Sequence, residues 1–352
     1  MSWCGIHGHD GVVANFRQSI RQNRLASTFL FIGPSGIGKQ MFALKMAQAL
    51  QCEKNSDLEF EPCQVCSPCQ QIIAETHPDV QFVGKPDDRS FIPISTFIGD
   101  KEHRNREGLC RWIGLKPSYG RRKIAVINDA DYLNQEGANS LLKTLEEPPP
   151  RSLLILIGTS QQRQLPTIRS RCQIVRFQAL DESFVAQHLQ TMGVARDEAH
   201  GIELAGLSNG SFDRAMLWAS DEWTGFRSEL WQTLGQGNID SFQLAKRITA
   251  FVDAAGKDAP SRRARLKVVI EMFLTFLREL MLARSGTSGH SDAELRTAVE
   301  SAAGSWSVGP ETIASRIDRC IEADQQVSAN ANIATLVECW IDDLFAQPVL
   351  DR

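Results

Sequence analysis

The stretch Gly33-Pro34-Ser35-Gly36-Ile37-Gly38-Lys39-Gln40 decides the fold of this chain. It follows an apolar run, residues 29–32, that is typical of a short buried strand, and it precedes residues 41–50, which contain no Gly or Pro and predict a helix. Strand, glycine-rich turn and helix form the context that a phosphate-binding loop requires, although an ordinary strand-to-helix turn is the alternative. Converging backbone N–H groups and the helix N-terminus attract polyphosphate, so we expect nucleotide to be bound by Gly33, Gly36, Gly38 and Lys39.

The position after the lysine departs from the phosphate-loop pattern. The pattern has a Ser or Thr hydroxyl there to hold Mg²⁺, and this chain has Gln40. An amide side chain is longer and less suited to the metal. We therefore expect ATP or ADP to be accepted at this loop, with Mg²⁺ poorly held and hydrolysis impaired.

A second departure follows the predicted strand over residues 123–127. A nucleotide-hydrolysing unit presents an acidic pair at this strand end, one carboxylate for Mg²⁺ and one for the attacking water. Here the first position is Asn128 and the second is the shorter acid Asp129, which we regard as a weak catalytic group. Ser160 follows the next predicted strand, residues 153–157, and is expected beside the γ-phosphate. Two metal-handling positions have changed, which favours a site that no longer needs to hydrolyse.

Four cysteines follow the first predicted helix at the spacing Cys52-x₁₀-Cys63-x₂-Cys66-x₂-Cys69. Four thiolates at this spacing can close a tetrahedron around Zn²⁺. An iron–sulfur cluster and unligated thiols remain as alternatives. The set has no open coordination position, so we expect a structural zinc, held in a surface knob over residues 52–69.

Composition bounds the class of protein. The chain has 352 residues, of which 42% are hydrophobic and 23% charged, and this length allows two or three domains. No apolar run approaches the roughly 20 residues that cross a bilayer, and the first ten residues lack the pattern of a secretory signal, so we expect a cytoplasmic protein without a membrane partner. Nine cysteines, an odd number, favour metal over disulfides in a reduced compartment.

The charge is unevenly distributed. The net charge of −4 argues against wholesale coating of nucleic acid. Residues 101–123, however, contain eight Lys or Arg against two Glu, and they predict a helix over 104–115. Such a basic segment is either a solvated face or a contact for a partner subunit or DNA phosphate.

The rest of the chain predicts strands early and helices late. Residues 10–24 have the apolar spacing of an amphipathic helix, and residues 173–177 read as the last strand. Beyond them we predict short helices over 181–220 and helices throughout 221–346. The domain prediction is a nucleotide-binding domain over 1–178, a lid over 179–220 and an oligomerisation domain over 221–352.

Together these motifs resemble the clamp-loader AAA+ ATPases of bacterial replication. The resemblance covers at least residues 3–218 and, more weakly, residues 321–336. The resemblance rests on four motifs: the loop ending at Lys39, the four cysteines, residues 139–149 (NSLLKTLEEPP) and Ser170-Arg171-Cys172. It implies a fold of the α/β class: a RecA-like AAA+ parallel sheet with a zinc-binding insert, a small helical lid and a C-terminal all-helical collar.

The resemblance also implies roles for two arginines. Arg171, in the serine-arginine-cysteine signature, resembles an arginine finger that acts in trans on the ATP of the next subunit. Arg169 is the alternative candidate for this role. Arg214 lies near the second nucleotide-sensing arginine of the family.

Within the family, Gln40 and Asn128 together with a retained Arg171 resemble the delta-prime, or stator, type of subunit. From its length of 352 residues we also expect a subunit without the long extension of a tau-type motor. The implied partners are motor (gamma/tau-type) and delta subunits in a hetero-oligomer, with the sliding clamp and primed DNA reached through that complex. Two alternatives remain: a gamma-like subunit with its own ATPase, and a stand-alone nucleic-acid-binding protein.

Overall fold

The computed structural model describes residues 3–86, 89–104, 106–119, 121–286 and 292–345. The chain divides into two compact units, which we call the first unit (residues 1–188 and 208–215) and the second unit (189–207 and 216–352). The lid predicted over 179–220 is shared between them. The three-part division therefore stays a prediction.

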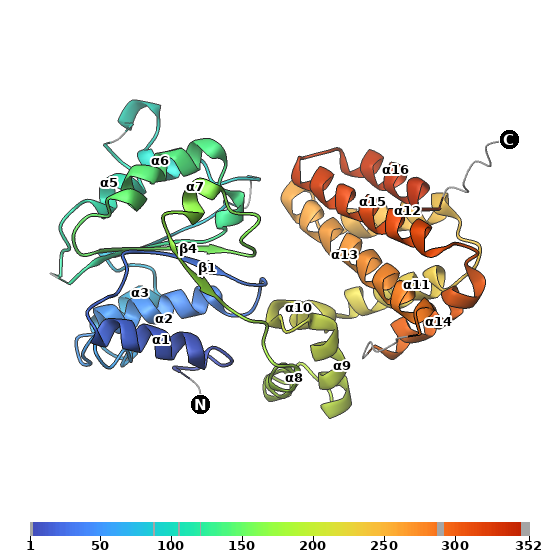
Figure 1. Cartoon of the computed structure of the whole chain (residues 1–352), viewed down its shortest axis with the longest axis horizontal. Coiled ribbons are helices and arrows are strands. Elements are labelled where there is room, and N and C mark those ends of the chain that lie inside the picture. Colours follow the sequence, from blue (N-terminus) through green and yellow to red (C-terminus); the bar gives the residue numbers. More distant parts are fainter. Residues whose placement is uncertain (1–2, 87–88, 105, 120, 287–291, 346–352) are drawn as a thin grey trace. The chain divides into compact units, whose positions relative to one another are not determined.

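The first unit contains a five-stranded parallel sheet (Figure 1). Its strand order is β2-β3-β4-β1-β5. Strands β1, β3 and β4 are buried along their whole length, as expected of parallel strands covered on both faces. The α/β class with a parallel sheet is thus confirmed, with strands β1 (Thr28–Ile32), β2 (Val80–Val83), β3 (Lys123–Ile127), β4 (Ser152–Gly158) and β5 (Gln173–Arg176).

Helices cover both faces of this sheet (Figure 1). Alternation along β1 sends Phe29 and Phe31 into one apolar core and Leu30 and Ile32 into the other. The first core is closed by α1 (Asp10–Arg21), α2 (Lys39–Gln51) and α3 (Ser67–Ile73). The second is closed by α4 (Ser95–Ile98), α5 (Leu109–Ile113), α6 (Gln135–Glu146) and α7 (Pro166–Arg169).

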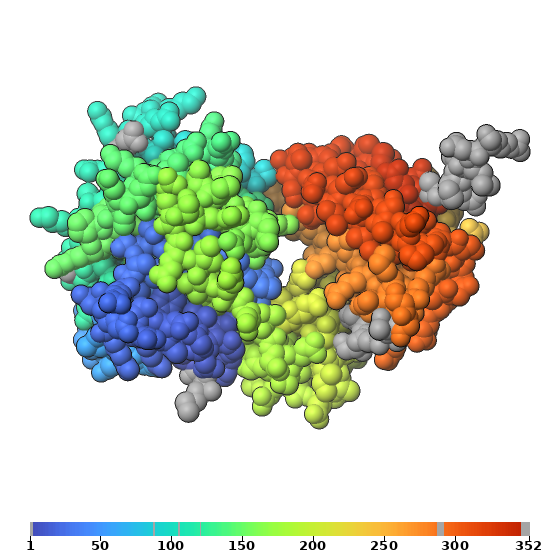
Figure 2. Space-filling model, in the orientation of Figure 1, coloured from blue at the N-terminus to red at the C-terminus, as the bar shows by residue number. Residues whose placement is uncertain are grey.

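The helix predicted over 104–115 is wrong in its extent. The structure has a 3₁₀ turn, η1 (Lys101–His103), and the short helix α5. Gly108 separates them with a φ of 89°, and a Cβ there would lie 2.6 Å from the backbone of Gly99 and Phe97, so the chain must turn at a residue without a side chain. Residues 105 and 120 of this basic segment lie outside the described residues. The long side chains of Lys101, Arg104 and Arg106 are exposed, and the segment stands out from the first unit in Figure 2, coloured teal.

After β5 the described residues form helices joined by turns and loops, and contain no strand, as predicted. Two aromatic residues illustrate how the second unit is packed. Trp340 is fully buried, and its ring lies 4.8 Å from that of Phe273. Residues 346–352 of the predicted collar lie outside the described residues. The helices are α8 (Glu182–Thr191), α9 (Glu198–Ser208), α10 (Phe212–Trp218), α11 (Asp221–Leu234), α12 (Ser241–Asp253), α13 (Ala259–Arg284), α14 (Ala293–Ser305), α15 (Pro310–Ser328) and α16 (Ile333–Phe345). Within the described ranges, none combines the length and apolar character needed to cross a bilayer.

A buried ion pair joins β3 to the turn before β2. Asp79 is fully buried and accepts hydrogen bonds from the backbone N–H groups of Ser118 and Tyr119 at 2.8 and 2.9 Å. Lys123 Nζ lies 3.2 Å from the same carboxylate and 4.2 Å from the centre of the Trp112 ring. Burial alone would raise the pKa of Asp79, but these donors and the ammonium lower it below its usual value. The pair therefore fixes the loop that leads into β3.

Replacing Asp79 with Asn is expected to destabilise the first unit by about 3 kcal/mol, because the buried Lys123 loses its counter-charge. The pKa of Asp79 is lower in the folded chain, so its stabilising effect is present above the unfolded value of about 3.9 and is lost as the pH falls through the folded value. Urea unfolding at pH 7 and at pH 3 measures both effects. Glu59→Gln removes an exposed acid of the same unit and serves as the control, whereas equal midpoints for the two variants would contradict the buried-pair account.

Candidate functional site

Residues 33–38, which we call the phosphate-type loop, link the carboxyl end of β1 to the first turn of α2. Gly36 and Gly38 have φ values of 69° and 90°, a region that residues with a Cβ rarely adopt. At Gly33 a Cβ would lie 2.4 Å from the carbonyl oxygen of Phe177. Each of the three glycines is thus required by the backbone path or by a close neighbour.

The N-terminal arm, residues 3–9, packs against this loop. His9 is buried and donates from Nε2 to the carbonyl oxygen of Ile37 at 2.8 Å. Trp3 is buried as well, and its ring stacks on that of Phe60 with centroids 4.8 Å apart. The arm is a packed part of the first core.

The lysine of the loop is engaged by the loop itself. Lys39 is only 6% exposed, and its Nζ donates to the carbonyl oxygens of Gly33, at 2.6 Å, and Pro34. Burial lowers the pKa of Lys39 to about 8, while the carboxylates of Asp131 and Asp213 act in the opposite direction. A nucleotide phosphate would have to draw this ammonium away from the two carbonyls.

Two acids near the lysine were missed from the sequence. Asp131 accepts a hydrogen bond from the backbone N–H of Thr159, just beyond β4, at 2.8 Å, and another from the side chain of Gln164. Asp213 lies directly against the loop, since a Cβ on Gly36 would be 2.7 Å from its Cβ. The only signal in the sequence was the position of Asp131 two residues after Asp129.

The metal-handling roles of Gln40, Asn128 and Asp129 stay predictions. Gln40 is exposed on α2, and Asp129 is exposed with a φ of 56°. Asn128 and Asp129 both lie beside Gly84, where a Cβ would be 3.3 Å from each side chain. Ser160 is nearer the loop, because Ile32 pairs with Gly158 across the two strands.

The start of α10 meets the phosphate-type loop. The backbone N–H of Phe212 donates to the carbonyl oxygen of Gly36 at 2.8 Å. Arg214 lies half-buried in the first turn of α10, and its backbone N–H donates to the hydroxyl of Ser211 at 3.3 Å. The role of Arg214 as a nucleotide sensor stays a prediction.

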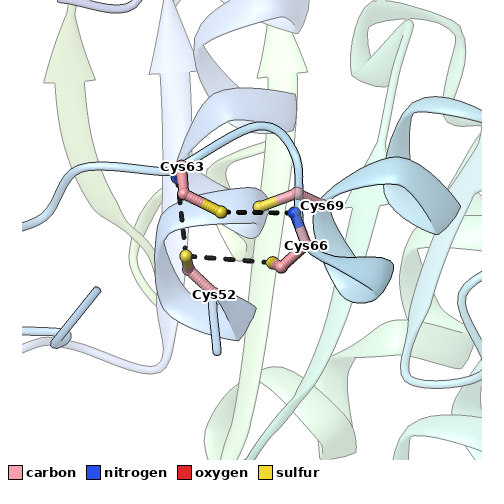
Figure 3. Close-up of side chains that lie close together, drawn as sticks. All are labelled: Cys52, Cys63, Cys66 and Cys69. Atoms are coloured by element: carbon pink, nitrogen blue, oxygen red, sulfur yellow. Dashed lines mark hydrogen bonds between the residues drawn. The ribbon is translucent and has the colours of Figure 1, made fainter. Parts of the chain in front are cut away.

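The four predicted metal ligands come together (Figure 3). Their Sγ atoms all lie within 4.8 Å of one another, and those of Cys52 and Cys66 are 3.9 Å apart. Two sulfurs bound to one tetrahedral zinc, each about 2.3 Å from it, would be about 3.8 Å apart, whereas a disulfide requires about 2.05 Å. Backbone N–H groups point at two of the sulfurs, from Cys63 to Cys52 at 3.4 Å and from Cys66 to Cys63 at 3.3 Å. The donor set therefore fits a structural zinc.

The insert that carries these cysteines is anchored in the first unit by buried side chains of its own, and the surface knob stays a prediction. Phe60 is fully buried and belongs to the first core, and Cys52 and Cys69 are also fully buried. Asp57 forms ion pairs with Arg121 and Arg122 at 2.9 and 3.4 Å. An aromatic anchor and this charge contact hold the insert against the unit.

Arg171 lies at the opposite edge of the sheet from the phosphate-type loop. Its carbonyl oxygen accepts a hydrogen bond at 2.8 Å from the hydroxyl of Thr28, the first residue of β1, while the loop follows Ile32, the last. A strand of five residues spans roughly 13 Å. Arg169 points elsewhere, because its Nη1 lies 3.4 Å from the carbonyl oxygen of Gln161, beyond the carboxyl end of β4.

A parallel sheet with this loop at its carboxyl edge defines a P-loop α/β protein. The family described as "DNA polymerase III, delta subunit" matches residues 8–181. The delta' subunit of DNA polymerase III from Bacillus subtilis is 27% identical over 91% of this chain and 91% of that protein. This chain is thus similar to delta' subunits of DNA polymerase III, in one case over most of its length.

Two further relatives are covered over a smaller share of their length, and one solved structure aligns over most of its own. The delta' subunit from Pseudomonas aeruginosa is 36% identical over 42% of each chain, and the tau subunit from Escherichia coli is 29% identical over 54% of this chain and 27% of that one. A gamma subunit-related protein from Thermotoga maritima aligns over 94% of this chain and 97% of its own, with a TM-score of 0.41 and 15% identity. That last similarity is too weak to carry an argument.

Replacing Cys66 with Ser is expected to abolish stoichiometric zinc binding, because three thiolates no longer close the tetrahedron. Metal content of the purified protein, measured by plasma mass spectrometry, should fall from about one zinc per chain to near zero, with a lower melting temperature of the first unit. Cys339→Ser, at an exposed cysteine outside the cluster, is the control and should keep its zinc. Iron in place of zinc, or full zinc retention by Cys66→Ser, would contradict this assignment.

Proposed function

We propose that this chain is the stator of a bacterial clamp loader: it contributes Arg171 to ATP held by a neighbouring motor subunit and turns over little or no ATP itself. The observation that carries the proposal is the position of Arg171 at the edge of the sheet where the strands begin, which we call the amino edge. There its carbonyl oxygen accepts a hydrogen bond from the hydroxyl of Thr28. From there the guanidinium is separated from the chain's own loop by the length of β1. A second chain could approach this edge with its nucleotide.

The phosphate-type loop supports the low turnover. Lys39 is satisfied by the carbonyl oxygens of Gly33 and Pro34, and the hydroxyl that would hold Mg²⁺ is replaced by Gln40. The Oδ1 atom of Asn128 is buried without a hydrogen-bond partner among the described residues, and an amide carries no charge to offset Mg²⁺. ATP or ADP binding at this loop is compatible with such a role, whereas efficient hydrolysis is not.

The proposed partners are taken from the relatives of this chain. Relatives of this chain are delta', gamma and tau subunits of DNA polymerase III. We therefore propose a cytoplasmic hetero-oligomer with gamma/tau-type motors and a delta subunit, which acts on the sliding clamp and primed DNA. In it, Cys52, Cys63, Cys66 and Cys69 would hold a zinc that stabilises the fold and takes no part in catalysis.

A gamma-like motor is the second candidate, favoured by the retained Lys39 and by the 29% identity to a tau subunit over 54% of this chain. Under the stator proposal, the purified chain hydrolyses no more Mg²⁺-ATP than its Lys39→Ala variant, because the metal ligands are missing. A coupled phosphate-release assay on both proteins measures this difference. Robust turnover by the chain that Lys39→Ala abolishes would favour the motor instead.

Replacing Arg171 with Ala is expected to lower ATP turnover at the site that receives it by on the order of 10³-fold, because the finger no longer stabilises the transferring phosphoryl group. The measurement is the clamp- and DNA-stimulated ATPase of the reconstituted complex, with assembly checked by its mass.

Arg169→Ala is the matched variant for that experiment, and it should leave turnover unchanged. If Arg169→Ala lowers the ATPase of the complex and Arg171→Ala does not, Arg169 is the arginine finger instead of Arg171. An unaltered ATPase in an intact Arg171→Ala complex would overturn the proposed function.

A further inference from the structure

The guanidinium of Arg171 is already heavily engaged within its own chain. Its Nε donates to Oε1 of Glu146 at 2.8 Å, and Nη2 donates to the same oxygen. Nη1 donates to the carbonyl oxygen of Thr167 at 2.9 Å and to the hydroxyl of Ser170 at 3.1 Å. A guanidinium has five N–H groups, and a bidentate phosphate contact needs two of them in parallel. These four hydrogen bonds leave one, so Arg171 must release a partner before it can clamp a phosphate.

Glu146 is the partner that is best placed to be released. Thr167 and Ser170 belong to the same short segment as Arg171, whereas Glu146 comes from the end of α6. The side chains of Arg171 and Glu146 are 29% and 49% exposed, and ion pairs in such settings are weak. Exchange with a more highly charged phosphate therefore costs little.

Glu146 also has a reason of its own to hold a cation. It is the last residue of α6, where a carboxylate faces the negative end of the helix dipole. Three prolines, residues 148–150, prevent the helix from continuing and fix Glu146 at this terminus. A guanidinium beside it relieves the unfavourable charge.

We propose that Glu146 is the resting partner of Arg171: it retains the guanidinium at the amino edge of the sheet and competes with the neighbouring subunit's nucleotide phosphate for it. The inference rests on the proposed function of Arg171. It adds a regulatory element, because the finger engages only where a phosphate outcompetes a carboxylate. Arg171 then passes from one anion to another without an unpaired intermediate.

Replacing Glu146 with Ala removes the competitor, so kcat/KM for ATP at the receiving site should rise about two- to fivefold in the reconstituted complex. Glu146→Gln keeps an acceptor oxygen without the charge and should give a smaller rise. The matched control is Glu147→Ala, which removes the neighbouring exposed carboxylate; within the described residues that side chain has no hydrogen bond or ion pair. It should leave kcat/KM unchanged.

Two further measurements separate this inference from the function on which it rests. In the Arg171→Ala background, Glu146→Ala should have no effect, because Glu146 acts through Arg171. In the isolated chain, ¹⁵N NMR should show severalfold faster exchange of the Arg171 Nε–H with water in Glu146→Ala than in wild type or Glu147→Ala.

Each outcome bears on the proposal. A fall in turnover with Glu146→Ala would make Glu146 an orienting group and overturn the competition, as would behaviour identical to Glu147→Ala or an unchanged Nε–H exchange rate. If Arg171→Ala itself leaves the ATPase unaltered, the proposed function fails and the inference fails with it. If Arg171→Ala lowers turnover and Glu146→Ala does not raise it, the inference alone fails.

Discussion

The parallel sheet is the constraint on which the functional geometry depends. Because all five strands run in one direction, segments that follow a strand gather at the carboxyl edge and segments that precede one gather at the amino edge. The phosphate-type loop follows β1, whereas Arg171 is bonded to Thr28 at its start. One chain therefore cannot bring both groups to a single nucleotide. Under the proposed function, an arginine at the amino edge acts only when another chain presents its own carboxyl edge to it, so assembly is part of the proposed chemistry.

The cysteine insert fits into the same framework through its anchors. Phe60 fills the first core, and its carbonyl oxygen accepts a hydrogen bond from Nε1 of Trp3 at 2.8 Å. Asp57 connects the insert to Arg121 and Arg122, and these lie next to Lys123, whose buried partner is Asp79. The metal ligands thus belong to a continuous set of contacts that reaches from the N-terminal arm to β3. A structural ion at this point would stabilise the unit that carries the loop rather than an independent module.

The sequence predicted the features that depend on local pattern. The buried strands, α2 and the four-cysteine spacing are encoded by short-range periodicity and by residue type, and the structure has all of them. The features that it missed depend on contacts between distant residues: Asp131 with Thr159, Asp213 with Gly36, and Glu146 with Arg171. The helix predicted over 104–115 failed for a local reason that pattern alone did not reveal, since Gly108 turns the chain where its backbone meets that of Phe97.

Lys39 and Arg171, the two cationic side chains that we propose for phosphate binding, both donate hydrogen bonds within the chain, but to different kinds of acceptor. Lys39 is buried against neutral carbonyl oxygens, and burial lowers its pKa to about 8, so drawing it out requires reorganising a closed loop. The guanidinium of Arg171 is held by a carboxylate that is itself half-exposed. An incoming phosphate therefore finds the arginine far easier to recruit than the lysine. Under the proposed function, this difference in accessibility, more than the loss of any single metal ligand, is what suits the chain to serve a neighbour's nucleotide rather than its own.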